Sequence, residues 1–318
     1  MAQWAPVFKG IATFIPGLYN IINRRKPVRA GDVEYYYDLW LKHLTLLWES
    51  GMRTMPKTLA EFGPGQSLGL GIAALLSGVA HYYALDVVLF ESPDKTLSML
   101  DAMVAMFHKR AGLTRQHTPS FDQYLDKNRF PSHILTEERL QQSLAPERIA
   151  LIRAALMKRS ADQTHLSVQY VAPWNDTNII PDGSIDVIIS HTVLEYVPDL
   201  PGIYQTCSTW LKPSGWMSHQ IDFTSHNITR EWNGTWGYSN ALWKLTIGKR
   251  PYFLNRQPCS RHLQFIEASD FEIRCAIRIK RDDGLPREKL ALEWRSLSDD
   301  DVTCAGVLLQ AQKKEVLN

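Results

Sequence analysis

The sequence predicts a doubly wound α/β fold, in which helices cover both faces of a mostly parallel sheet. Residues 58–62 form a short apolar strand, and the Gly-Pro-Gly run at 63–65 then forces a tight turn, because glycine tolerates a positive φ freely. Residues 68–80 follow as an apolar helix, which completes a strand-turn-helix unit. Residues 84–88 and 185–190 are near-continuous apolar strands of the kind that parallel sheets require.

The glycine turn predicts a binding site for an electron-rich ligand. Free backbone N–H groups and the helix dipole both point at the space beside the start of a helix. Asp86 lies 21 residues after Gly65, within the second apolar strand. In a strand-helix-strand unit, this spacing places the Asp86 carboxylate where the hydroxyls of a ribose would bind. A strand-turn-helix unit without any ligand is the alternative.

The glycine pattern of this turn separates two ligand classes. Dinucleotide-binding enzymes carry a third glycine at the position of Leu68, so their fingerprint fails here. The pattern Glu61-x-Gly63-x-Gly65 instead resembles the first motif of class I S-adenosylmethionine-dependent methyltransferases. The resemblance implies a Rossmann-like fold with S-adenosyl-L-methionine as the cofactor and its ribose on Asp86. It also implies that the methionine part of the cofactor passes these residues: Glu61, Gly63, Pro64 and Gly65.

A second stretch resembles the middle motifs of the same family. Pro-Asp-Gly-Ser-Ile-Asp at 181–186 precedes Ser-His-Thr-Val-Leu-Glu-Tyr-Val at 190–197. Family members usually carry an aspartate 12 residues before the strand aspartate, where this chain has Trp174. This departure affects the usual contact with the adenine amino group, for which Asn175 and Asp176 are the candidates. Trp174 either stacks on the adenine ring or packs in the core.

Composition narrows the class of protein. A length of 318 residues suits one large domain with an insertion, and 45% hydrophobic with 21% charged residues is typical of globular proteins. The net charge of +2 gives no reason to expect a nucleic-acid partner. The four cysteines form no C-x-x-C pair, which argues against a zinc site and favours a reducing, cytoplasmic compartment. We expect neither a signal peptide nor a membrane span, and the oligomeric state stays open.

The domain organisation follows from the length of the connections. We expect an N-terminal helical cap at 1–57 and a methyltransferase domain at 58–318, with a helical insertion at about 90–165 and an acceptor-side lid at about 224–265. The insertion is predicted to be a side layer that walls the acceptor pocket, because such long connections are often functional. The last two strands are expected at 271–280 and 302–313, and the resemblance implies that the last one runs antiparallel.

Two helices are predicted in the N-terminal cap. Residues 3–15 place apolar side chains at helical spacing, and a basic cluster follows at 24–29. An apolar face beside basic residues can rest on the inner face of an anionic membrane, although we favour packing of this helix on its own domain. The second helix, from Glu34 to about Ser50, carries Tyr37 and His43, which either cover the cofactor or pack in the core.

Four polar residues are candidates for catalysis. A sulfonium activates its methyl group, so the protein mainly aligns donor and acceptor, but a hydroxyl acceptor also needs a base. Open α/β sheets bind ligands at the carboxyl ends of their strands, and the fourth and fifth parallel strands end near His191, His219, Asp222 and His226. We prefer His226 or His191 as the base, with Asp222 orienting it or gripping the substrate. His191 is also a candidate cofactor contact, and each residue has a purely structural alternative.

His219 and Asp222 differ by three positions in a strand, so their side chains point to opposite faces. The two therefore reach one pocket only if the strand ends between them. No spacing among these residues is diagnostic of a metal, and no metal site is predicted.

Aromatic and amide side chains crowd the segment after the fifth strand. Such faces and donors suit a sugar, and an ordinary amphipathic lid is the alternative; the candidates are Trp232, Trp236, Tyr238, Asn255 and Arg256. Tyr37-x-x-Trp40-x-x-His43 and Ser218-His-x-Ile-Asp222 resemble a bacterial subgroup associated with surface-polysaccharide biosynthesis. We therefore expect O-methylation of a sugar or glycan hydroxyl. The alternatives are a small-molecule amine or phosphate acceptor, and a non-catalytic cofactor-binding module.

Overall fold

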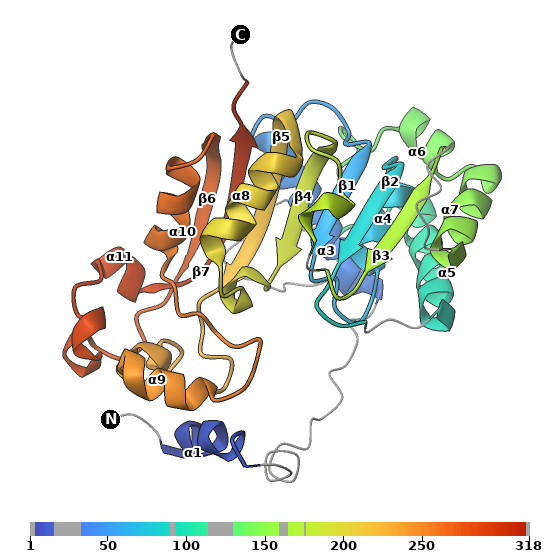
Figure 1. Ribbon diagram of the computed structural model, residues 1–318. Coiled ribbons are helices and arrows are strands. Elements are labelled where there is room, and N and C mark those ends of the chain that lie inside the picture. Colours follow the sequence, from blue (N-terminus) through green and yellow to red (C-terminus); the bar gives the residue numbers. More distant parts are fainter. Residues whose placement is uncertain are drawn as a thin grey trace.

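A computed structural model describes residues 4–15, 33–89, 93–113, 130–158, 165–174 and 176–315. Its centre is a seven-stranded sheet with helices on both faces (Figure 1). The strands are β1 (Thr58–Phe62), β2 (His81–Leu85), β3 (Ser167–Val171), β4 (Ile185–His191), β5 (Leu211–Asp222), β6 (Phe271–Lys280) and β7 (Cys304–Lys313). Their order in the sheet is β3-β2-β1-β4-β5-β7-β6.

The directions of the strands confirm the predicted fold class. β1 pairs in parallel with β2 and β4, β2 with β3, and β4 with β5, whereas β7 runs antiparallel to both of its neighbours. Chain order reverses between β1 and β4, which makes their carboxyl ends a topological switch point. The second strand was expected at 84–88 but lies at His81–Leu85, so Asp86 follows the strand instead of lying within it.

One face of the sheet is covered by α3 (Val33–Glu49), α4 (Gly69–Leu76), α5 (Pro93–Lys109), α6 (Glu137–Ser143) and α7 (Pro146–Lys158). Every residue of α4 is buried, because α3 and α5 pack on the side that faces away from the sheet. Two glycines allow this close packing. A Cβ on Gly69 would lie 2.4 Å from the ring of Tyr36, and one on Gly71 would lie 2.1 Å from the ring of Tyr82.

The opposite face carries α8 (Leu200–Trp210) and α10 (Cys259–Glu267). Phe62, Ile188 and Met217 project from the sheet into this second core, where they meet Trp210 of α8. Several shorter elements lie in the connections between the strands and helices. They are η2 (Thr177–Ile179), η3 (Leu194–Tyr196), η4 (Gly234–Gly237), η5 (Arg287–Lys289), η6 (Leu292–Trp294) and α11 (Asp299–Val302).

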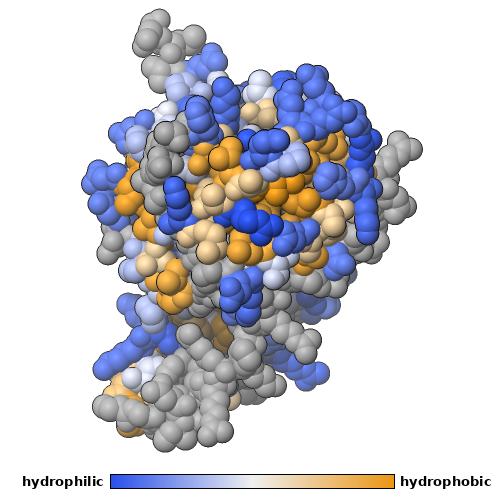
Figure 2. Space-filling model, turned by 90° about the vertical axis from the view of Figure 1, so that its right-hand side faces the viewer, coloured by the Kyte–Doolittle hydropathy of each residue, from blue (hydrophilic) through white to orange (hydrophobic). Residues whose placement is uncertain are grey.

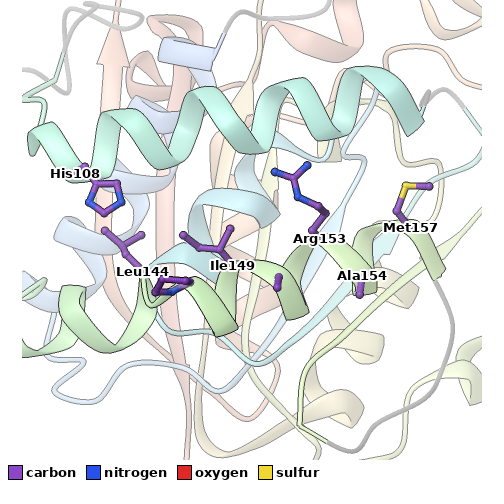
Figure 3. Close-up of a pocket in the computed structure, with 8 residues that line it drawn as sticks. His108, Leu144, Ile149, Arg153, Ala154 and Met157 are labelled. Atoms are coloured by element: carbon purple, nitrogen blue, oxygen red, sulfur yellow. The ribbon is translucent and has the colours of Figure 1, made fainter.

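The insertion between β2 and β3 contains α5, α6 and α7, which pack against α4 and β3 as a side layer. An apolar groove of about 670 Å³ lies between α5 and α7, lined by Leu144, Ile149 and Met157 among others (Figure 3). Residues 114–129 of the insertion lie outside the described residues, so its proposed contact with an acceptor stays a prediction.

Two further helices lie beyond the carboxyl ends of the parallel strands. α1 (Trp4–Ala12) packs on α9 (Asn240–Ile247), at the bottom of Figure 1. The expected basic cluster at 24–29 lies outside the described residues. No helix among the described residues is long and apolar enough to cross a membrane.

Candidate active site

The glycine turn after β1 adopts the predicted left-handed conformation. Gly63 and Gly65 both have a φ of 66°, which favours glycine over any other residue. A Cβ on Gly63 would lie 2.5 Å from Cγ2 of Val193, so the turn touches the loop that follows β4. A Cβ on Gly65 would meet no atom within 4 Å. The turn is therefore closed on the side of β4 and open beside Gly65, where a ligand can approach its backbone.

Asp86 fastens this turn to the end of β2. Its Oδ2 accepts a hydrogen bond of 2.9 Å from the Gly65 N–H, and its Oδ1 accepts one of 2.7 Å from the Val87 N–H. The Asp86 carbonyl accepts a hydrogen bond of 3.0 Å from the Trp174 N–H, which brings the loop after β3 to the same place. Each carboxylate oxygen has further acceptor capacity, so ribose hydroxyls can bind Asp86 without breaking these bonds. The residues present thus fit a nucleoside ligand.

Glu61 is more enclosed than its motif suggests. Its carboxyl group is buried on the α4 face of β1 and accepts a hydrogen bond from the Tyr82 hydroxyl. Burial raises the pKa of Glu61 to about 8, although the Tyr82 hydrogen bond opposes this shift. Glu61 is therefore largely protonated at neutral pH, and any contact with the cofactor would use a neutral carboxyl group.

The adenine contacts stay predictions. The Trp174 ring is half-buried and stacks on Phe62, with centroids 5.3 Å apart and planes at 14°. One face of the Trp174 ring therefore packs in the core, which was one of the two alternatives for this residue. Asp176 caps η2 by accepting a hydrogen bond of 2.8 Å from the Asn178 N–H. Asn175 lies outside the described residues.

Tyr37 and His43 lie on α3 and are buried in the protein core rather than over the glycine turn. The Tyr37 hydroxyl donates a hydrogen bond of 2.7 Å to the Ala111 carbonyl. Nδ1 of His43 is hydrogen bonded to Oγ of Ser218 at 2.7 Å, and burial holds the pKa of His43 well below its ordinary value. Both residues therefore pack in the core, which was the alternative to covering the cofactor, and we do not propose that either contacts the cofactor.

His191 and His219 differ in their access to the site. His191 ends β4 next to the glycine turn, and its ring lies edge-on to Tyr35 at 6.0 Å. His219 has an exposed fraction of 0% and is hydrogen bonded to Oγ of Ser190 at 2.8 Å. Burial lowers the pKa of His219 to about 3. His219 thus lies in the core as a neutral side chain, which argues against a catalytic role, and we do not propose one.

Asp222 and His226 come together at the end of β5, as expected. Nε2 of His226 lies 3.1 Å from Oδ2 of Asp222, and Nδ1 of His226 is hydrogen bonded to the Tyr196 hydroxyl. Burial would raise the pKa of Asp222, but the interactions with His226 and the Thr224 N–H outweigh it and hold that pKa below its ordinary value. His226 has a φ of 47°, a conformation that non-glycine residues adopt only where surrounding contacts enforce it.

Sequence reasoning missed Tyr196 and Glu195, although both lie in the stretch that resembled a family motif. Glu195 has an exposed fraction of 3%, and neither of its carboxyl oxygens has a hydrogen-bond partner among the described residues. Its Oε1 lies 3.9 Å from Nε2 of His226. Burial raises the pKa of the Glu195 carboxyl group well above its ordinary value.

A polar cavity of about 440 Å³ opens beside this cluster. Most of its lining can form hydrogen bonds, and Trp232 supplies an aromatic side. The lining residues are Asp222, Thr224, Ser225, His226, Asn227, Thr229, Arg230, Trp232 and Arg281. Within the ranges given above, no three His, Cys, Asp or Glu side chains are placed to hold a metal ion together.

Four of the five residues predicted to contact a sugar make contacts within the protein. The Trp236 indole donates a hydrogen bond of 2.9 Å to the Arg256 carbonyl, and Tyr238 is buried. The Arg256 guanidinium donates to the Tyr238 carbonyl at 2.8 Å and lies 4.7 Å from the Trp243 ring centre. These contacts support a packing role for Trp236 and Arg256, and a role of the three side chains in acceptor binding stays a prediction.

Asn255 also has a structural role. Its amide donates hydrogen bonds of 2.7 and 2.8 Å to the carbonyls of Leu194 and Val197, at the two ends of η3. The Asn255 N–H donates a further bond of 2.8 Å to the Glu195 carbonyl. Asn255 thus fixes the loop that carries Tyr196.

Comparison with known proteins identifies the family. The model of a methyltransferase domain family matches residues 56–275, which include the glycine turn, Asp86 and the Asp222–His226 cluster. The chain belongs to this family. As a member, it is an S-adenosylmethionine-dependent methyltransferase, and S-adenosylmethionine is its cofactor.

Solved structures with a similar course of the chain include several methyltransferases. A methyltransferase from Mesorhizobium loti has 13% sequence identity and a TM-score of 0.41, with 86% of this chain and 98% of that chain covered. One from Methanosarcina mazei has 10% identity and a TM-score of 0.42, covering 85% and 98%. Geranyl diphosphate C-methyltransferase from Streptomyces coelicolor has 13% identity and a TM-score of 0.40, covering 86% and 75%. A search of curated proteins found no significant match.

Proposed function

We propose that this methyltransferase transfers a methyl group to a hydroxyl of a sugar or glycan. The observation that carries the proposal is that Asp222 and His226 line a polar cavity, and that His226 is also hydrogen bonded to the Tyr196 hydroxyl. An alcohol acceptor requires a base, whereas a more nucleophilic acceptor does not. The hydroxyl, amide and guanidinium groups of the lining, with Trp232 on one side, suit a polyhydroxylated ligand.

The cofactor, when bound, supplies a methyl group that is already activated by the positive charge on sulfur. The Gly65 backbone and Asp86 would hold its ribose end, as their open side and remaining acceptor capacity support. His191 lies next to the same turn, at the end of β4, and is a candidate to contact the cofactor there.

The proton chemistry follows from the partners of His226. An Nε2–H that faces the Asp222 carboxylate leaves Nδ1 as the acceptor, and Nδ1 takes its hydrogen bond from the Tyr196 hydroxyl. The substrate hydroxyl would pass its proton to the Tyr196 oxygen while the Tyr196 proton moves to Nδ1. Asp222, whose pKa is held low, would stabilise the imidazolium that forms. One proton thus leaves the substrate oxygen as it gains the methyl group.

His226→Ala tests the base directly. Loss of general-base catalysis should lower turnover of a sugar acceptor by about 100-fold or more. Binding of S-adenosylhomocysteine, measured by calorimetry, should stay unchanged, because Asp86 and the glycine turn are intact. His191→Ala is measured beside it, because His191 is the other candidate for the base and a candidate cofactor contact. Full turnover in His226→Ala would contradict the proposed chemistry and favour an acceptor that needs no base.

A further inference from the structure

An apolar surface that the proposed reaction does not use lies on α1, on α9 and on the turns that follow these two helices. We call it the α1–α9 surface. Its large apolar side chains are exposed, with fractions of 61% for Trp4 and 64% for Phe8. The other members are Ile11, Phe14, Ile15, Leu245 and Tyr252. The surface lies beyond the carboxyl ends of the parallel strands, away from the α5–α7 layer (Figure 1).

The exposed residues of α1 form one stripe. Trp4, Phe8 and Ile11 follow one another at spacings of four and three residues, which place them on one side of the helix, and Phe14 and Ile15 are exposed in the turn that follows it. The stripe faces solvent, although such a stripe on a globular protein ordinarily faces the core. The rest of α1 packs on the protein through its buried residues, Val7, Gly10 and Ala12.

The packing of α1 on α9 is close and specific. A Cβ on Gly10 would lie 2.0 Å from the Leu245 carbonyl oxygen, and one on Gly248 would lie 2.2 Å from the Gly10 carbonyl oxygen. The Lys249 N–H donates a hydrogen bond of 2.7 Å to Oγ1 of Thr13. These contacts fix α1 with its apolar stripe outward, so the exposed surface is a built feature of the fold.

The charges around the stripe have one sign. Every charged residue in 4–15 and 240–253 is basic, namely Lys9, Lys244, Lys249 and Arg250. Nζ of Lys249 lies 5.5 Å from the Phe14 ring centre, and the Arg250 guanidinium lies 3.9 Å from that of Phe253. The acidic Glu293 packs at the opposite end of α9, where its carboxylate accepts the Asn240 N–H. A cationic rim of this kind is complementary to an anionic partner and opposes association with a second copy of itself.

We propose that the α1–α9 surface binds the face of an anionic lipid bilayer. Aromatic and aliphatic side chains of an amphipathic helix enter the boundary between headgroups and acyl chains, while basic side chains remain among the anionic headgroups. Trp4 and Tyr252 are of the residue types that favour this interface. The helices lie on the membrane and do not cross it.

The α1–α9 surface connects directly to the acceptor side. Val7 and Trp243 belong to one apolar cluster, against which Tyr196 and Ile228 pack. Tyr196 is hydrogen bonded to His226, which lines the polar cavity. A bilayer bound at this surface would therefore lie next to the loops that carry the acceptor cluster.

The molecule offers a matched control surface. Leu151 and Met157 on α7 are 53% and 55% exposed, and Figure 2 shows apolar side chains gathered on this side of the molecule. Acidic and basic residues are mixed there, and Arg153 is paired with Asp101. The α7 surface is comparably apolar, but the charges around it are of both signs. Comparing the two surfaces therefore shows whether membrane binding needs the basic residues or only exposed apolar side chains.

Vesicle co-sedimentation of the full chain tests the proposal. We expect binding to vesicles of phosphatidylcholine with phosphatidylglycerol, weaker binding to phosphatidylcholine alone, and release by salt, which screens headgroup charge. Phe8→Glu should lower partitioning by about tenfold or more, because an exposed anchor becomes an anion. Lys9→Glu with Lys244→Glu should do the same, whereas Leu151→Glu should bind like the parent. Unchanged binding of S-adenosylhomocysteine would show that each variant is folded.

Three results would overturn the proposal: no binding of the parent chain to anionic vesicles, equal binding of Phe8→Glu, or equal loss in Leu151→Glu. Analytical ultracentrifugation adds a fourth. A dimer that Phe8→Glu abolishes would identify a second copy of the chain as the occupant of this surface.

Discussion

The donor side and the acceptor side of the site are built by different means. On the donor side, the backbone of the glycine turn sets the geometry. The Gly63 N–H donates to the Leu85 carbonyl, and the Gly65 N–H donates to the Asp86 carboxylate. On the acceptor side, side chains set the geometry, since Asn255 holds η3 and Asp222 meets His226. Backbone geometry follows from glycine positions and spacing, whereas a side-chain network depends on residues far apart in the sequence. The two sides should therefore fail independently when mutated.

Next to the loss of the base itself in His226→Ala, the largest effect expected on the acceptor side comes from Tyr196→Phe. Removing the hydroxyl interrupts the proposed proton path to Nδ1 of His226 but leaves the aromatic ring to pack. Turnover of a sugar acceptor should fall by about 100-fold, with the affinity for S-adenosylhomocysteine unchanged. A loss of cofactor affinity of similar size would show that the two sides are not separate. Full activity would show that His226 takes the proton without Tyr196.

Asn255→Ala should destabilise the acceptor side, because Asn255 holds the loop that carries Tyr196. Two carbonyls, those of Leu194 and Val197, lose their donor, and the Gln257 N–H loses its acceptor. We expect a loss of about 1–3 kcal/mol in the free energy of unfolding. Denaturant titration measures it, with Asn178→Ala as a control, because the Asn178 amide bonds only locally at the surface. Equal stability of the two variants would contradict the scaffold role.

Glu61→Gln should produce a smaller effect, on the donor side, that depends on pH. The pKa of Glu61 rises from an ordinary 4.5 to about 8 on folding, so the folded state binds one more proton between these values. Parent stability should therefore fall as pH rises through this window and level off above it. The amide introduced by Glu61→Gln does not titrate, so the variant should gain relative to the parent as pH rises. Parallel stability curves across this window would contradict the raised pKa.

Much of the donor side could be predicted from the sequence. β1 and β6 have the predicted bounds, because their apolar runs are bounded by glycine or polar residues. β2 was placed three residues too late, since His81 and the two tyrosines after it did not stand out as strand residues. Tyr82 is buried against α4 and Tyr83 in the core on the opposite face, and such packing depends on elements distant in the sequence.

The acceptor side was predicted less well. Trp236, Tyr238 and Arg256 have the composition of a sugar site, but composition does not tell which way a side chain points. Arg256 lies between two indole rings, those of Trp243 and Trp294, and this contact depends on a segment more than thirty residues away. The pairing of Tyr196 with His226 spans 30 residues for the same reason. Asp222 and His226 were found because both follow one strand end.

Calorimetric titration with S-adenosylhomocysteine tests the central claim, that the cofactor binds at the open side of Gly65 with its ribose on Asp86. We compare the parent with Asp86→Ala and with Asp222→Ala, which removes a carboxylate from the acceptor side. The account predicts that Asp86→Ala loses at least about tenfold in affinity, as the loss of hydrogen bonds to a charged group implies, while Asp222→Ala binds like the parent. Normal binding by Asp86→Ala, or an equal loss in both variants, would contradict it.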